Sequence, residues 1–138
     1  MIFGNRTLES VRGLRTTVFE GNPFPFALQE PSGPPQDVHA MSRSSTSIQV
    51  YWSPPLLSER NGIITHYTVK YQPQSGQYRS VNTADNTTSI FIDNLDIFTR
   101  YSFVIKAWNV VGAGPGSQPV YNTTLEGSKF YISPVVFS

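Results

Sequence analysis

The chain has 138 residues, enough for one ordinary domain with tails and too few for two. Ten Lys and Arg residues nearly balance nine Asp and Glu residues, so net charge gives no basic stripe for phosphates, and nucleic acid is not an expected partner. Cysteine is absent, which excludes thiol catalysis, disulfides and thiolate metal sites but leaves the cellular compartment open.

The first segment, residues 1–31, has neither helical nor strand periodicity, and its phenylalanines are interleaved with Pro23 and Pro25, which disfavour both structures. We expect an extended or disordered leader over residues 1–31 and a C-terminal tail over residues 128–138. The apolar start of the chain is too short for a secretory signal. The longest apolar stretch falls well below the ~20 residues of a membrane helix, so we expect no direct membrane insertion by this chain.

From residue 32 onward, short alternating segments separated by turn clusters are typical of a β-sandwich or barrel. Residues 37–41 and 47–52 predict the first two strands. Asn61-Gly62 predicts a turn, and residues 64–71 predict the third strand. The residues of the second and third strands that we expect to face inward are Ile48, Val50, Trp52, Tyr67, Val69 and Tyr71.

The second half of the domain continues the pattern with a short strand over residues 78–82 and another around Ile90 and Ile92. Residues 100–108 predict the longest strand, and residues 119–124 predict the last. The glycine-rich segment 112–116 predicts a flexible loop. Seven strands and no helix predict an all-β fold, a two-sheet sandwich. The residues of the longest strand expected to face inward are Tyr101, Phe103, Ile105 and Ala107.

Several of these residues form a known pattern. Pro34-Pro35 precedes the first strand, Trp52-Ser53-Pro54-Pro55 ends the second, and Tyr67-Thr68-Val69-Lys70-Tyr71 forms the third. Over about residues 32–126 the chain resembles a fibronectin type III domain, of the kind found in neural adhesion molecules and receptor tyrosine phosphatase ectodomains. The resemblance implies a seven-stranded immunoglobulin-like sandwich over residues 32–127. The matching residues in the second half are Leu95, Thr99, Tyr101, Ala107, Asn109, Gly112, Gly114 and Ser117.

The resemblance also implies structural roles. Trp52 would be the largest core side chain, and the hydroxyl of Tyr101 would bond to backbone near Leu95 in a tyrosine corner. Gly112 and Gly114 would allow positive φ in the loop before the last strand. The implied structural core consists of Trp52, Tyr67, Val69, Tyr71, Leu95, Tyr101 and Ala107.

The sequence departs from the family at two positions. Ile97 stands where a proline is usual, which should loosen the corner slightly. In the last strand, alternation would turn the polar Asn122 inward together with Val120 and Thr124. A bulge or a register shift there would resolve this conflict.

No residue pattern points to catalysis. His39 and His66 lie on different predicted strands without the spacing of a metal-binding pair, and no nucleophile elbow is present. The loop 112–116 opens no helix, so it lacks the N–H donors and dipole of a phosphate site. It also lacks an Arg-Gly-Asp tripeptide, so integrin binding by that route is not expected. We therefore expect no enzyme activity, metal or cofactor.

Three Asn-x-Ser/Thr sequons begin at Asn5, Asn86 and Asn122. Asn86 lies in a predicted turn, where a glycan would fit if the protein is secreted. Asn122 is a weaker candidate because its side chain is expected to face inward.

Outward positions are candidates for a partner surface, since clustered exposed aromatic residues are often binding hot spots. Tyr51 and Phe91 lie on strands expected to pair, which would give an exposed aromatic couple. Val104 and Trp108 lie outward on the longest strand. Alternatively, these four residues only cover the sheets or pack on the leader and tail.

These features favour a non-catalytic module that binds proteins or spaces domains in a cell-adhesion molecule or receptor ectodomain, at the cell surface. Residues 31–35 and 124–127 resemble junctions with neighbouring modules. The alternative is an intracellular spacer module, as in giant muscle proteins. A cytokine-receptor module is disfavoured because paired cysteines and a Trp-Ser-x-Trp-Ser stretch are missing. The protein partner itself is not identified by the sequence.

Overall fold

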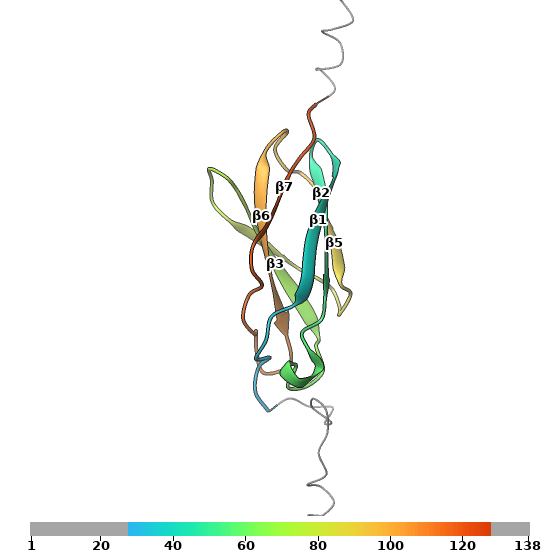
Figure 1. Cartoon of the computed structure of the whole chain (residues 1–138), viewed down its shortest axis with the longest axis vertical. Helices are drawn as coiled ribbons and strands as arrows, with labels where there is room; N and C mark the ends of the chain where they lie inside the picture. Colours follow the sequence, from blue (N-terminus) through green and yellow to red (C-terminus); the bar gives the residue numbers. More distant parts are fainter. Residues whose placement is uncertain (1–27, 128–138) are drawn as a thin grey trace, which may run out of the picture.

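The computed structural model describes residues 28–127, and the expected N-terminal leader up to residue 27 and tail from residue 128 lie outside the described residues. Two antiparallel sheets face each other with their strands along the long axis of the domain (Figure 1). The predicted seven-stranded sandwich is confirmed. The strands are β1 (Gln36–Ser44), β2 (Ser47–Ser53), β3 (His66–Pro73), β4 (Arg79–Asn82), β5 (Ser89–Ile92), β6 (Arg100–Trp108) and β7 (Val120–Thr123).

One sheet has the order β1-β2-β5 and the other has the order β4-β3-β6-β7. The strands begin and end within a few residues of the predicted bounds, and β6 matches them fully. The expectation of no helix is wrong at one place, because a single 3-10 turn, η1 (Leu57–Glu59), lies between β2 and β3. This turn follows the Pro54-Pro55 pair, which cannot continue a strand ladder, and it leaves both sheets intact.

The core lies between the sheets and is formed by the inward residues of alternating strands. Trp52 is 4% exposed and meets the ring of Tyr67 edge-on, with 5.2 Å between the ring centroids. No described residue accepts a hydrogen bond from the Trp52 indole N–H. Tyr71 is half-buried against the core. The buried members of the core are Ile48, Val50, Trp52, Ile64, Tyr67, Val69, Ile92, Leu95, Tyr101, Phe103, Ile105 and Ala107.

The corner before β6 is stabilised by Tyr101, a residue that is only 1% exposed. The backbone N–H of Asp96 donates to the Tyr101 hydroxyl at 2.8 Å, one residue beyond Leu95. Thr124 adds two bonds, since its hydroxyl donates to the Asp96 carbonyl at 2.6 Å and accepts from Thr99 N–H at 2.8 Å. The corner with Ile97 is therefore pinned by hydrogen bonds on both sides.

The last strand keeps its regular register, so neither a bulge nor a register shift resolves the conflict at Asn122. Asn122 does face inward, and it is half-buried. Residues of β1 form hydrogen bonds with its side-chain amide. Its Nδ2 donates to the Ala40 carbonyl at 3.0 Å, and its Oδ1 accepts from the Ser42 hydroxyl. A polar side chain can face the space between sheets when its hydrogen bonds are met there.

The two loop glycines do not have the conformation expected of them. Among the described glycines only Gly62 has positive φ, at 137°, in the predicted Asn61-Gly62 turn. Gly114 is needed for space instead, since a Cβ there would lie 2.7 Å from the carbonyl oxygen of Pro31. A Cβ on Gly112 would meet nothing closer than 3.9 Å.

The residues just before the first strand are part of the folded unit. Pro31 is fully buried, although the predicted leader extended through it. The carbonyl of Gln29 accepts from Asn109 Nδ2 at 2.8 Å, and that of Glu30 accepts from Asn61 Nδ2 at 2.9 Å. The chain therefore joins the domain by residue 29, beside the loops that follow β2 and β6.

Candidate interaction surface

The outward face of the β1-β2-β5 sheet carries Tyr51 and Phe91, as predicted, but their rings have different surroundings. The register places Phe91 opposite Gln49, and Tyr51 opposite Ser89. Tyr51 stacks on His39 with 5.0 Å between centroids, and its hydroxyl accepts from Arg43 at 2.6 Å. Phe91 is 53% exposed. The two rings thus offer separate features, and Tyr51 is occupied by its own sheet.

Val104 and Trp108, on the outward face of β6, are also covered by their neighbours. Trp108 stacks on His66 with 5.1 Å between centroids, and its Nε1 donates to the hydroxyl of Thr68 at 2.7 Å. Val104 lies under the loop before β7, where a Cβ on Gly116 would come 2.8 Å from it. Both residues are half-buried, so this pair covers the sheet in the way that the alternative interpretation described.

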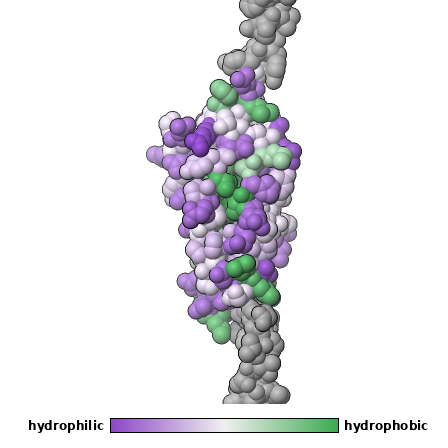
Figure 2. All heavy atoms as spheres, viewed as in Figure 1, coloured by the Kyte–Doolittle hydropathy of each residue, from purple (hydrophilic) through white to green (hydrophobic). Residues whose placement is uncertain are grey.

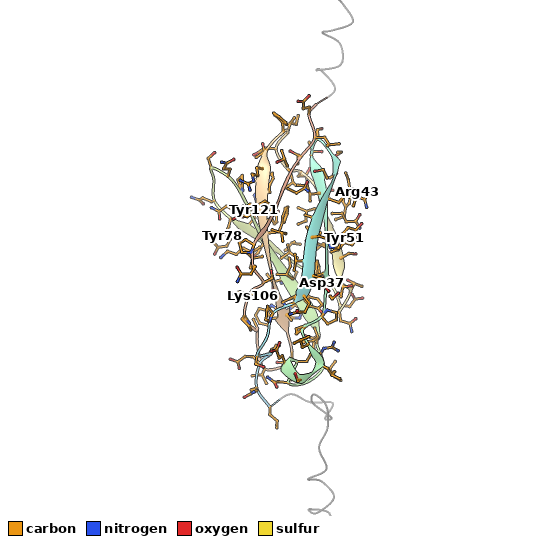
Figure 3. All side chains as sticks on the ribbon, viewed as in Figure 1. Asp37, Arg43, Tyr51, Tyr78, Lys106 and Tyr121 are labelled. Atoms are coloured by element: carbon orange, nitrogen blue, oxygen red, sulfur yellow. The ribbon has the colours of Figure 1, made fainter. Side chains whose placement is uncertain are left out.

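Long cationic side chains on the same sheet lie over exposed rings. Lys70 Nζ is 4.1 Å from the centroid of Tyr78, and the Arg100 guanidinium is 4.3 Å from that of Tyr121. Figure 3 shows Tyr78, Lys106 and Tyr121 on one side of the sandwich, and Arg43 and Tyr51 on the other. Cation–π contacts of this kind hold flexible side chains in place while leaving their charge open to solvent.

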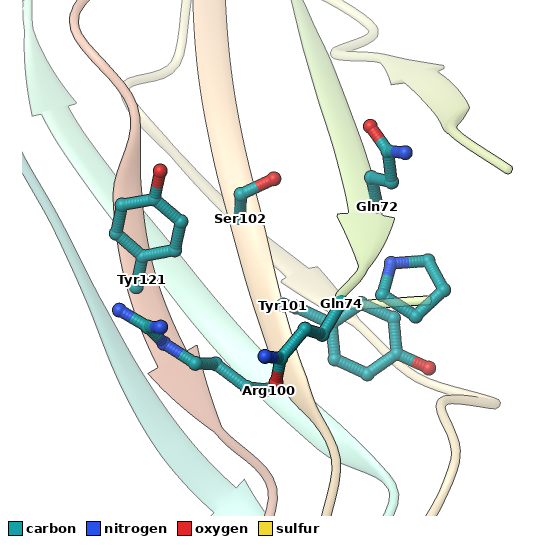
Figure 4. Close-up of a pocket in the computed structure, with 7 residues that line it drawn as sticks. Gln72, Gln74, Arg100, Tyr101, Ser102 and Tyr121 are labelled. Carbon is teal, nitrogen blue, oxygen red and sulfur yellow. The ribbon is translucent and has the colours of Figure 1, made fainter. Parts of the chain in front are cut away.

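An open groove of about 240 Å³ lies beside Arg100 and Tyr121, where β3, β6 and β7 meet (Figure 4). Gln72 and Ser102 face each other across β3 and β6, and Tyr121 is opposite Ser102 on β7. The groove is lined by polar groups together with a proline and two tyrosine rings, so its character is mixed. The lining residues are Gln72, Pro73, Gln74, Arg100, Tyr101, Ser102 and Tyr121. Apart from Tyr101, which was predicted as a core residue, these groove residues were not predicted as site residues, although strand alternation alone places Arg100 and Ser102 outward.

The buried tyrosines titrate above their ordinary range. Desolvation by burial raises the pKa of Tyr67 above its usual 10.0, and the nearby Arg60 offsets part of this change. Burial likewise raises the pKa of Tyr101, and the bond from the Asp96 backbone offsets part of it. Both phenols belong to the core.

The histidines have structural partners in the described part of the chain. His39 stacks on Tyr51, and His66 stacks on Trp108. Within residues 28–127 no group of three His, Asp or Glu residues could hold a metal ion. In the same range no helix has the length and hydropathy needed to cross a membrane.

The three sequons differ in their surroundings. Asn86 is exposed in the turn between β4 and β5, where Thr87 N–H bonds to the Asp85 carboxylate at 3.0 Å. The Nδ2 of Asn122 donates to the Ala40 carbonyl, so the atom that would carry a glycan is occupied. Asn5 lies outside the described residues.

The family model of the fibronectin type III domain matches residues 33–123. The human cell adhesion molecule DSCAM is 41% identical over 107 residues, and the zebrafish (Danio rerio) receptor-type tyrosine-protein phosphatase F is 38% identical over 104 residues. These matches cover 73% and 72% of this chain but 5% of each relative.

Solved structures agree with this family. The FN5 domain of Drosophila Lar is 29% identical, with a TM-score of 0.58, over 70% of this chain and 99% of that one. The third fibronectin III domain of human KIAA0343 protein has a TM-score of 0.68 at 23% identity, over 82% and 95%, which supports the fold alone. The chain belongs to the fibronectin type III domain family.

Proposed function

We propose that this chain is a non-catalytic module of a cell-adhesion molecule or receptor ectodomain, which binds a protein partner or spaces neighbouring modules. The 41% identity with a module of human DSCAM carries the proposal. The chain spans about 5% of the length of that relative, so the activity and partners of a whole adhesion protein reach this chain only by inference.

The shape of the domain supports a spacing role. The first described residues lie at one end of the long axis and the last lie at the other, as an in-line module requires (Figure 1). At the N-terminal end, the side chains of Leu57, Ile63 and Val110 are 51%, 56% and 74% exposed. At the other end, Phe98 is 59% exposed, and its N–H bonds to the Leu125 carbonyl. Apolar side chains at both ends would be covered by neighbouring modules.

Cell-surface placement is testable through Asn86. The full chain, directed through the secretory pathway of a mammalian cell line, should carry a glycan at this exposed turn. Glycosidase treatment should then lower its mass. In a chain that carries Asn5→Gln, which removes the first sequon, Asn86→Gln should abolish that change, whereas Asn122→Gln should leave it intact. An unmodified Asn86 would favour the alternative of an intracellular spacer module.

A second observation is independent of glycans. The sequence that flanks this chain in its natural gene product should contain tandem modules and a membrane helix. Flanking modules of a muscle-type protein without a membrane helix would contradict the proposal.

A further inference from the structure

The two lateral sides of the sandwich, where an edge of one sheet lies beside an edge of the other, are closed to different degrees. On one side hydrogen bonds join β1 to β7, because the Ser42 hydroxyl donates to the Thr123 carbonyl and Asn122 Nδ2 donates to the Ala40 carbonyl. On the other side the edges are β4 and β5, and no strand within residues 28–127 pairs with the outer edge of either. We refer to this second side as the open side.

A hollow of about 210 Å³ lies between β4 and β5 on the open side. Tyr71 and Val81 line it and are only half-buried, so the edge of the core is accessible here. β4 begins with the charged Arg79. β5 (Ser89–Ile92) contains no charged residue, proline or glycine, which are features that protect exposed strand edges from pairing. β5 is therefore the edge on this side that is better suited to accept another strand.

The backbone groups of β5 alternate between the neighbouring strand and the free edge. The Thr88 carbonyl accepts from Trp52 N–H at 3.0 Å, so Thr88 directs its backbone groups toward β2. In an antiparallel ladder alternate residues bond to opposite sides, so the N–H and C=O groups of Ser89, Phe91 and Asp93 are directed to the free edge. Phe91 is also 53% exposed. The middle of the free edge thus combines open hydrogen-bonding groups with an exposed ring.

This edge is complementary to itself. When two copies pair in antiparallel fashion about Phe91, the two Phe91 residues lie opposite each other, and Ser89 lies opposite the partner's Asp93. A serine hydroxyl can donate to an aspartate carboxylate, and opposed aromatic side chains stabilise a strand pair. Asp93 is the only charged residue in the segment 89–93, so this register brings no like charges together.

The outward face of the sheet continues the same pattern. Met41 is opposite Gln49, and Gln49 is opposite Phe91, so the three residues lie in line across β1, β2 and β5. Met41 is 46% exposed. Pairing through β5 would place the two Phe91 rings at the centre of this line, and protein interfaces usually have such an aromatic centre.

We propose that two copies of this chain associate by antiparallel pairing of β5 with β5, which joins their β1-β2-β5 sheets into one continuous sheet with Phe91 at the two-fold axis. This proposal rests on the proposed function, because it names a second copy as the protein partner of the module. It uses the open side and leaves both ends of the domain free for neighbouring modules. One short strand pair is a small interface, so the association is weak.

Sedimentation equilibrium of the purified full chain, produced in bacteria without glycans, measures this association. The average mass should rise from one chain toward two as the concentration approaches about 1 mM, the range of weak complexes. Phe91→Lys should abolish the rise, because it places two positive charges opposite each other at the axis. Met41→Lys is the matched control, since it puts the same charge at a similarly exposed apolar position of the same sheet, away from β5. It should leave the rise unchanged.

A mixture of variants tests whether Phe91 meets its own counterpart. Phe91→Lys and Phe91→Glu chains should each remain single, and their equimolar mixture should associate, because opposite charges then meet at the axis. Thermal unfolding checks that each variant is folded. A mixture that stays monomeric would contradict pairing about Phe91.

A cross-link tests the register directly. The chain has no cysteine, so Phe91→Cys would introduce a single thiol. Directly opposed residues of a hydrogen-bonded antiparallel pair have Cα atoms about 5.5 Å apart, a distance that a disulfide spans. Mild oxidation should therefore give a covalent dimer of Phe91→Cys, whereas Met41→Cys should remain a single chain.

Three results would overturn the proposal: a wild-type chain that stays monomeric, an equal loss of association in Met41→Lys, or equal cross-linking at both cysteine positions. None of them depends on a glycan at Asn86 or on the flanking sequence. Failure of self-association is therefore distinct from failure of the proposed function.

Discussion

The Tyr101 hydroxyl links the corner before β6 to the core through one hydrogen bond. Removing this group alone measures how much that bond contributes to stability. Tyr101→Phe keeps the buried ring but leaves the Asp96 N–H without its partner. We expect a loss of about 1 kcal/mol in unfolding free energy, measured by urea denaturation. Tyr78→Phe is the control, since that residue is 58% exposed and the ring that holds Lys70 is retained. Equal losses in both variants would show that the corner bond adds nothing.

Tyr67 and Tyr101 also predict how stability depends on alkaline pH. Burial raises the pKa of both phenols above 10.0, so the folded state keeps protons that the unfolded chain releases. Their contribution is fully present below the unfolded pKa of about 10 and is lost as pH rises through the raised folded values. Urea midpoints measured upward from neutral pH should stay level and then fall above about pH 10. Tyr67→Phe should make that fall shallower, and an unchanged slope would contradict the role of this phenol.

At the scale of single elements, the loop before β7 contains two glycines that differ in the space available for a side chain. Gly114→Ala places a methyl group 2.7 Å from the backbone oxygen of Pro31, which cannot move aside like a flexible side chain. We expect a loss of about 1–3 kcal/mol, seen as a lower denaturation midpoint. Gly112→Ala has 3.9 Å of clearance and ordinary φ, so it should change the midpoint little. A loss in Gly112→Ala as large as that in Gly114→Ala would point to loop flexibility instead of close approach.

Strand positions could be predicted because alternation and turn residues are local signals. Ile48, Val50 and Trp52 alternate with polar residues, and all three are buried in β2. What could not be predicted depends on partners distant in sequence. The inward Asn122 is satisfied by Ala40 and Ser42, about 80 residues earlier, and a local pattern cannot show that bond.

The candidate surface was predicted less completely for the same reason. Tyr51 was expected to couple with Phe91, yet its ring stacks on His39, because the strand register rather than the alternation decides which side chains meet. The groove beside Arg100 has no sequence motif either. Gln72 on β3 and Ser102 on β6 become neighbours only when those strands pair.

At the scale of the whole molecule, charged and apolar groups are in different places. On the face shown in Figure 2, hydrophilic residues dominate and hydrophobic patches are small and separate, with some at both ends of the domain. The basic residues gather on one sheet, while the exposed apolar residues Ile63 and Phe98 lie in loops. The domain can therefore contact neighbouring modules through its two ends while the polar outward face of the β4-β3-β6-β7 sheet stays exposed.

The N-terminal end also decides where the stable unit begins. Pro31 is fully buried, and the carbonyls of Gln29 and Glu30 accept hydrogen bonds from Asn109 and Asn61. Asn109 is 3% exposed, and its Nδ2 also bonds to the Arg60 carbonyl at 3.1 Å. Removal of residues 29–31 would therefore expose Asn109 and loosen both loops at this end.

We predict that a chain of residues 28–138 is more stable than one of residues 32–138 by about 2–4 kcal/mol, from two hydrogen bonds and one buried proline. Urea denaturation of the two chains measures this difference, and hydrogen exchange should show faster opening around Asn109 in the shorter one. Pro31→Ala in the longer chain should lower the unfolding free energy by only part of that difference, because the Gln29 and Glu30 carbonyls still accept their hydrogen bonds. Equal midpoints for the two chains would place the boundary at residue 32, since the contacts of residues 29–31 would then contribute no net stability.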